Sequence, residues 1–401
     1  MSQQSSSPAS RNAASTDVVA RVNRTKLIEL LREAGPLTRQ QIAERTALSA
    51  TTVIRLTTTL TAARTIEVAG SATSGGGRPA QLYRYVGESR CSAVVQVHAD
   101  RVAGALVNMG GEVIFRRSSR YRSETGAGAS PAADQWTVIR SLVRSLIHEA
   151  ENMSVPAVAI GVAVPGPVNT AGVTLPMTQI GWAGMDLGEL LRAEFALPAA
   201  VENDANALAV GEHSRGCGAD DMVAMIVQEG VGAGIVTNGR LHRGSRFEAG
   251  EVGYLLVGQG ALSGPAGRRG ELESQLSPEY LAHQLDRHDA RPRADETASV
   301  PYVLGRASAG EAAAMAVAED VLDLLAVATA ALVSVLDPEV VVLGEGFAPL
   351  DFTIPELEAR LRDRVMAPPR IVPATFGDDG VFVGMAELAA SNENRFAYLA
   401  Y

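Results

Sequence analysis

Residues 201–212 read VENDANALAVGE, and the interpretation of the whole chain depends on this stretch. The pattern predicts a buried strand that ends at Glu202, Asn203 and Asp204, with a helix after it. A carboxylate at the end of a buried strand can take a proton from a substrate hydroxyl, or it can hold a ligand by accepting hydrogen bonds. The other segments of the sequence decide between these two roles for Asp204.

Length and composition limit the class of protein. At 401 residues the chain is long enough for two or three domains of ordinary size, and its 46% of hydrophobic and 20% of charged residues are typical of a soluble globular protein. The longest apolar runs are too short to span a bilayer, and no stretch has the layout of a signal peptide. Two cysteines, Cys91 and Cys217, form neither a disulfide framework nor a metal-ligand pattern. We therefore expect a cytoplasmic protein with no membrane contact.

Charge is distributed unevenly along the chain. Residues 1–90 contain twelve basic and six acidic residues, a balance of +6, whereas the remainder carries −16. The net charge of −10 disfavours a protein coated in nucleic acid over its whole surface. A basic N-terminal part joined to an acidic body is typical of a DNA-binding module fused to a domain that binds a small molecule.

The first 87 residues predict a disordered tail followed by a small helical domain. Residues 1–18 are rich in Ser, Ala and Gln and have almost no large apolar side chain, so we expect them to be disordered. In residues 19–87 a first helix ends at Ala34-Gly35-Pro36, and a second begins at a capping box formed by Thr38 and Gln41.

The third segment of this domain, LSATTVIRLTTTL, gives two conflicting signals. Its β-branched residues favour a strand, but the spacing of Val53, Leu56 and Leu60 favours a helix capped by Ser49. We predict the helix because the spacing of the apolar residues shows which side chains are buried on one face. The segment IEVAGSATSGGGRPAQLYRYV then predicts two strands around a Gly-rich turn, so the domain is predicted to be a winged helix-turn-helix.

In a helix-turn-helix, the N-terminal side chains of the recognition helix face base edges in the major groove. The candidates for DNA contact are Ser49, Thr51, Thr52 and Arg55, with Arg55 as the base reader. Arg78, at the tip of the wing, is a candidate for the minor groove. The alternatives are a solvated arginine on the helix and an ordinary flexible turn at the wing.

From residue 93 onward, strand-like and helix-like segments alternate, which predicts an α/β body with helices on the faces of a sheet. Six segments of this body resemble, in their order, the motifs of the ROK family, which contains repressors and sugar kinases. They are GVAVPGPV (161–168), ENDANALAVGE (202–212), EGVGAGI (229–235), GRLHRGSRFEAGEVGY (239–254), LDPEVVVLGEG (336–346) and GDDGVFVGMAELA (377–389). Each segment is weak evidence alone, and together they are specific.

The resemblance spans residues 21 to about 395 and implies a two-lobed actin-like domain of the ribonuclease H-like ATPase type, with sugar between the lobes. We expect the first lobe at residues 88–200, the second at 201–380, and a C-terminal helix at 381–398 that returns to the first lobe.

The resemblance also implies that a sugar kinase of this family uses the aspartate matching Asp204 as general base, next to a phosphate-binding D-x-G-x-T turn. In this sequence Gln96 replaces the acid, His98 the glycine and Asp100 the hydroxyl residue. A carboxylate a few ångströms from phosphate is unfavourable by about 4 kcal/mol at moderate dielectric. Phosphoryl transfer depends on positioning and charge neutralisation, so we expect no kinase activity. A second loop keeps Gly230, Gly232 and Gly234, either as a vestigial phosphate loop or as a tight hairpin bend.

Sugar contacts are expected from Asn203 and Asp204, because an amide beside an acid suits sugar hydroxyls, although an Asx turn that caps the following helix is the alternative. The resemblance adds Glu251 and Tyr254, which match the family motif E-x-G-H, and Glu273, which could also be a solvated charge at a helix start. The family's zinc ligands are that histidine and three cysteines. At those positions this sequence has Tyr254, Gly264, Ala266 and Glu271, so we expect no zinc and no other cofactor.

Together these features predict a sugar-responsive transcriptional regulator, a repressor of genes for carbohydrate uptake or metabolism. Its expected partners are a double-stranded DNA operator, a sugar or sugar phosphate effector, and further copies of itself in a homodimer or homotetramer. Two alternatives stay open: an ATP-dependent sugar kinase with a DNA-binding head, and a DNA-binding regulator that responds to no ligand.

Overall fold

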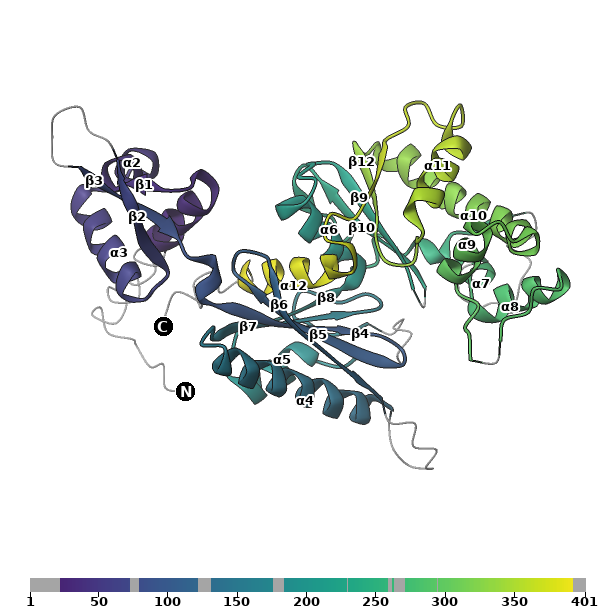
Figure 1. Cartoon of the computed structure of the whole chain (residues 1–401), viewed down its shortest axis with the longest axis horizontal. Helices are drawn as coiled ribbons and strands as arrows, with labels where there is room; N and C mark the ends of the chain where they lie inside the picture. The colour runs from purple at the N-terminus through teal and green to yellow at the C-terminus, as the bar shows by residue number, and fades with distance from the viewer. Residues whose placement is uncertain are drawn as a thin grey trace, which may run out of the picture.

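The computed structural model describes residues 22–72, 79–121, 131–175, 184–228, 230–258, 262, 271–293 and 295–391. In Figure 1 these residues form a small N-terminal head and a body built on two sheets. The predicted tail at 1–18 lies outside the described residues, as do Arg78 at the wing tip and two of the four zinc-loop positions, Gly264 and Ala266.

The head consists of a helix at residues 22–34, two further helices and a three-stranded sheet. The helices are α2 (Arg39–Thr46) and α3 (Ala50–Ala62), and the sheet has the order β1 (Leu37–Thr38), β3 (Ala80–Tyr85), β2 (Ile66–Ala72). The capping box of Thr38 and Gln41 is present at the start of α2. The helix predicted over the Thr-rich segment is confirmed: Ser49 caps it, and Val53, Leu56 and Leu60 are buried.

The first sheet of the body has the strand order β6-β5-β4-β7-β8. Its strands are β4 (Cys91–Val97), β5 (Arg101–Asn108), β6 (Val113–Arg120), β7 (Ala157–Val164) and β8 (Ala199–Asn203). Strands β4, β7 and β8 run parallel, while β5 and β6 form an antiparallel extension. Helices α4 (Pro131–Asn152) and α5 (Leu187–Phe195) cover one face (Figure 1).

The second sheet has the order β11-β10-β9-β12-β13. Its strands are β9 (Met222–Val227), β10 (Val231–Thr237), β11 (Arg240–Leu241), β12 (Val340–Leu343) and β13 (Arg370–Pro373). One face packs on a helical layer made of α7 (Glu271–Gln275), α8 (Pro278–Arg287), α9 (Val300–Ser308), α10 (Ala312–Leu336) and α11 (Leu350–Leu361). The body thus consists of two sheets, each covered by helices, which confirms the α/β architecture predicted from the alternation of strand-like and helix-like segments.

Two helices lie between the sheets and belong to one hydrophobic core with both of them. They are α6 (Asp204–Arg215) and α12 (Gly380–Ser391), and their core contains residues of both sheets, such as Val94 and Met222. Strand β8 stays in the first sheet through Asn203, three residues beyond the lobe boundary expected at 200. The chain therefore passes from one sheet to the other through α6, directly after the ENDAN segment.

Candidate functional site

Asn203 and Asp204 lie where β8 ends and α6 begins. The side-chain oxygen of Asn203 accepts a hydrogen bond from the backbone N–H of Asn206 (3.0 Å), so Asn203 caps α6. Its Nδ2 donates to the carbonyl of Gly166 (3.3 Å), just past the neighbouring strand β7. The capping alternative is thus realised for Asn203. Asp204 is buried, and its Oδ1 accepts from the N–H of Ala205 (2.8 Å).

Glu202, one residue earlier, forms an ion pair that links the two sheets. Its Oε2 accepts hydrogen bonds from Nε and Nη2 of Arg243, at 2.9 and 2.6 Å, and its Oε1 accepts from Nδ2 of Asn206 at 3.1 Å. Arg243 lies in the loop after β11, and Glu202 is buried. This pair was not predicted from the sequence, although a charged residue at the end of a buried strand is a signal that a cation is needed.

Two glycines hold the segment before Glu251 and Tyr254 close to the start of α6. A Cβ on Gly234, in β10, would lie 2.1 Å from the carbonyl oxygen of Ala205. Gly250 has a φ of +91°, and a Cβ there would lie 1.7 Å from the carbonyl of Ala233, whose N–H donates to Gly250. Close packing against α6 is therefore sufficient to explain why residue 234 is a glycine. The same packing brings the 250–254 segment to the end of α6 that carries Asp204.

Glu251 and Glu273 lie close enough for the charge of Glu273 to act on the Glu251 carboxyl. Burial, and to a lesser extent the charges of Glu273 and Glu248, together raise the pKa of Glu251 to about 7. Glu273 is buried against the 3-10 turn that contains Tyr254, because a Cβ on Gly253 would lie 2.6 Å from its Oε2. The three predicted sugar-binding carboxylates, Asp204, Glu251 and Glu273, thus lie on segments that pack against one another. Tyr254 itself is 40% exposed.

The strand that would bear the phosphate turn, β4, ends in buried polar groups. Gln96 and His98 are buried, and Nε2 of Gln96 has no hydrogen-bond partner among the residues described. Asp100 is exposed and pairs with Arg101 at 3.2 Å, so part of its charge is compensated. Of the glycines of the second loop, Gly232 and Gly234 lie within β10, and their phosphate role stays a prediction.

The candidate DNA-contacting residues lie at the exposed N-terminal part of α3. Thr51 and Arg55 are exposed, while Ser49 accepts from the N–H of Thr52 and its hydroxyl lies 2.8 Å from the Thr52 hydroxyl. Between them Ile54 is 50% exposed, and it was not singled out from the sequence.

The zinc positions are only partly described. The side chain of Glu271 is not described, and the two loop positions are outside the described residues. In the described part of the chain, no three His, Cys, Asp or Glu side chains are grouped as a metal would require. The absence of zinc stays a prediction. No helix in the same part of the chain has the length and apolarity needed to cross a membrane.

Comparison with known proteins gives a family match over most of the body. A family model described as ROK family matches residues 94–392. The xylose repressor of Bacillus spizizenii is 24% identical over 269 residues, which cover 67% of this chain and 68% of that protein. The glucokinase of Halalkalibacterium halodurans is 30% identical over 262 residues, covering 59% of this chain and 77% of the enzyme.

Among solved structures, a ROK family transcriptional regulator described as a homologue of the E. coli MLC protein is similar over nearly the whole molecule. The TM-score is 0.77 at 20% identity, over 95% of this chain and 98% of that one. At this identity the likeness concerns the fold. Because it covers 95% of the chain, it includes the head as well as the body.

Proposed function

Because the chain belongs to the ROK family, we propose that it is a sugar-responsive transcriptional repressor whose head binds operator DNA and whose body binds the effector. The observation that carries the proposal is the attachment of a head with an exposed, capped α3 to a body with a carboxylate-rich site at the start of α6. The xylose repressors among its relatives and the fold match through the head support it.

The head has the parts of a winged helix-turn-helix. Helix α2 packs under α3, and the β2–β3 hairpin follows as the wing. Arg55 offers a guanidinium to guanine, and Ile54 an apolar contact to thymine, while Ser49, Thr51 and Thr52 are placed for phosphates or base edges. Arg78 on the wing is proposed for the minor groove. Two such heads on a homodimer or homotetramer would read a two-fold operator.

The chemistry of the body favours an effector without a phosphate group. Asp204, Glu251 and Glu273 concentrate negative charge, and the raised pKa of Glu251 reflects burial and its acidic neighbours. A phosphorylated sugar would add like charge to this site, which is unfavourable. Carboxylate and phenol oxygens accept hydrogen bonds from sugar hydroxyls, so a neutral sugar is the better fit. Asp204 then holds the ligand and performs no proton transfer.

A sugar kinase is the second candidate, because relatives such as the glucokinase share the body. Buried Gln96 and His98 stand where the resemblance places the Mg²⁺-binding acid and a phosphate-turn glycine, so the metal and phosphates have no cradle there. A coupled assay of ATP consumption over a panel of hexoses, pentoses and N-acetyl sugars tests this candidate. Turnover at an enzyme-like rate would overturn the assignment of the body as a sensor.

The proposed function is tested by fluorescence anisotropy with DNA from upstream of the chain's own coding sequence, at about 150 mM salt because affinity depends on salt. Each sugar of the panel is added in its neutral form and, in a separate titration, in its phosphorylated form. We expect one neutral sugar to weaken DNA binding and to raise the melting temperature, and its phosphate to do neither. Asp204→Asn should abolish both effects, whereas Asp295→Asn, an exposed carboxylate, should change neither.

A further inference from the structure

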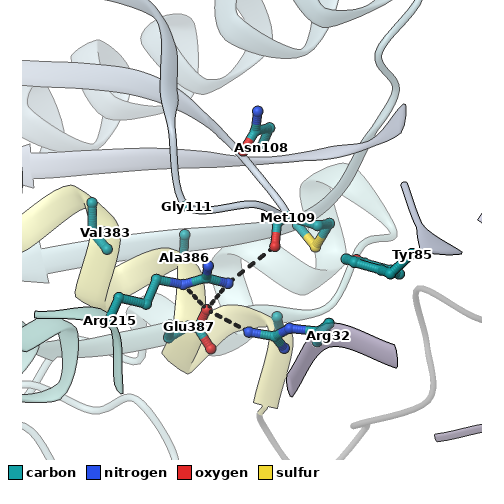
Figure 2. A pocket seen from close by; sticks show the side chains of 10 residues that line it. Arg32, Tyr85, Asn108, Met109, Gly111, Arg215, Val383, Ala386 and Glu387 are labelled. Carbon is teal, nitrogen blue, oxygen red and sulfur yellow. Dashed lines mark hydrogen bonds and ion pairs between the residues drawn. The ribbon is translucent and has the colours of Figure 1, made fainter. Parts of the chain in front are cut away.

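The head meets the body at a cluster of three charged side chains, shown in Figure 2. Arg32 comes from the helix at 22–34, Glu387 from α12, and Arg215 is the last residue of α6. Oε1 of Glu387 accepts from Nη2 of Arg32 at 3.2 Å and also from the guanidinium of Arg215. The carboxylate is 17% exposed and the Arg215 side chain 18%, so this pairing is less screened than a fully exposed ion pair.

Arg215 also binds the turn between β5 and β6, which touches the connection to the head. Its guanidinium donates to the carbonyls of Met109 (3.0 Å) and Gly110. The N–H of Met109 in turn donates to the carbonyl of Gly87 (2.9 Å), at the point where the chain leaves the head. A Cβ on Gly87 would lie 2.7 Å from the nitrogen of Gly110, so the connection and the turn are in direct contact. Arg215 therefore contacts both places where the body meets the head, namely Glu387, which binds Arg32, and the β5–β6 turn, which binds Gly87.

Helix α6 carries this arginine at one end and Asp204 at the other. The helix has 12 residues. At 1.5 Å per residue its ends are roughly 17 Å apart. Its middle is in close contact with α12, because a Cβ on Gly211 would lie 2.9 Å from the carbonyl of Gly380 and one on Gly384 would lie 1.7 Å from that of Ala207. Packed helices of this kind move as one body, so a displacement of Asp204 reaches Arg215 and Glu387 together.

We propose that Arg215, Glu387 and Arg32 form the link through which the sugar site sets the position of the head. Within the link, Arg215 and Glu387 belong to the α6–α12 unit, and only the bond that Arg32 donates to Glu387 crosses from the head to the body. Movement of the unit on sugar binding changes or breaks that bond and releases the head from its fixed orientation. This inference rests on the proposed function of the body as a sugar sensor.

The first test measures the orientation of the head and needs neither sugar nor DNA. Spin labels on Thr61→Cys, at the end of α3, and Ser141→Cys, on α4, report the distance distribution between head and body. Both positions are exposed; Cys217 is replaced by alanine, and Cys91 is buried and stays.

Glu387→Gln removes the charge shared by the two arginines, and Arg32→Gln removes the head's partner. We expect each variant to broaden or shift the distance distribution, while Glu29→Gln, an exposed charge on the same head helix as Arg32, leaves it unchanged. Melting temperatures of all variants check that the fold is kept. A distribution identical to that of the wild type in both Glu387→Gln and Arg32→Gln overturns the inference.

The second test measures transmission, with the panel sugar that stabilises the wild type as the probe. We expect the ratio of DNA affinities without and with sugar, about 5- to 150-fold for a coupling of ordinary size, to fall below about 2-fold in Arg32→Gln and Glu387→Gln. Thermal stabilisation by the sugar should be unchanged, because Asp204 is untouched. A wild-type ratio in both variants contradicts the link. If the wild type itself responds to no sugar, the proposed function fails, and the distance distribution alone decides whether these residues hold the head.

Discussion

Arg243 binds the buried Glu202 through two guanidinium nitrogens, at 2.9 and 2.6 Å, and so joins the loop after β11 to the strand that carries Asn203. The same carboxylate accepts hydrogen bonds from the N–H of Asn203 and from Nδ2 of Asn206. The first residues of α6 are thus held in place by one acid, whose charge is balanced by an arginine from the loop that follows the second sheet's β11. This arrangement fixes the position of Asp204 relative to β8 on one side and to the loop after β11 on the other.

Arg243→Met should destabilise the body by about 3 kcal/mol, because it leaves the Glu202 carboxylate buried without its cation. The free energy of unfolding, from urea titration followed by far-UV circular dichroism, measures the loss. The double variant Arg243→Met with Glu202→Gln should recover part of it, since no unpaired charge remains. Equal loss in the single and double variants would mean that packing of the arginine, and not its charge, is what matters.

The raised pKa of Glu251 predicts a pH-dependent stability. In the folded protein this carboxyl keeps its proton up to about pH 7, whereas in the unfolded chain it loses it near its ordinary value. The favourable contribution of the protonated form is present below the unfolded pKa and is lost as pH rises through the folded one. Glu251→Gln should therefore be more stable than the wild type by about 3 kcal/mol at about pH 8 and similar to it at about pH 4.5.

Urea titrations at both pH values measure this difference. Glu358→Gln, an exposed glutamate on α11, is the control and should show no such dependence on pH. A constant difference between Glu251→Gln and the wild type over this range would contradict the raised pKa of Glu251 in the folded protein.

The elements of the fold that could be predicted are those with one buried face. Helix α3 followed from the spacing of Val53, Leu56 and Leu60, because burial imposes the helical period whatever the propensity of the threonines between them. The expected C-terminal helix reaches Ser391 in the described residues, and its return to the first sheet came from family resemblance, since no local pattern specifies a distant partner.

The candidate site also contains features that could be predicted from the sequence and others that could not. The segment 202–204 is recognisable because its residues are adjacent, and the capping role of Asn203 is local too. The pairs Glu202–Arg243 and Arg215–Glu387 join residues 41 and 172 positions apart, and Arg32–Glu387 joins residues 355 apart. Ion pairs between such distant residues leave no periodic trace in a single sequence, so only the tertiary structure reveals them.

Arg55→Ala should weaken binding to the operator by about 1 to 3 kcal/mol, because a guanidinium that reads guanine contributes that much discrimination. Anisotropy with the specific fragment and with a scrambled fragment at equal salt separates base reading from phosphate contact. We expect the loss on the specific fragment to exceed the loss on the scrambled one. Equal losses would reassign Arg55 to the phosphate backbone, and no loss on either would remove it from the interface.

Gly384→Ala should separate α6 from α12 and so destabilise the core that the two sheets share. The added Cβ would lie 1.7 Å from the carbonyl of Ala207, which is backbone and cannot rotate away. Overpacking of this kind is unfavourable by about 1 to 3 kcal/mol. The matched control is Gly305→Ala in α9, where a Cβ meets nothing within 4 Å. There the better helix propensity of alanine should stabilise the protein by up to about 1 kcal/mol. Thermal unfolding measures both variants, and we expect the melting temperature to fall in Gly384→Ala and to rise in Gly305→Ala. A neutral or stabilising effect of Gly384→Ala would contradict the close contact between α6 and α12, through which Asp204 and Arg215 are held in one rigid unit.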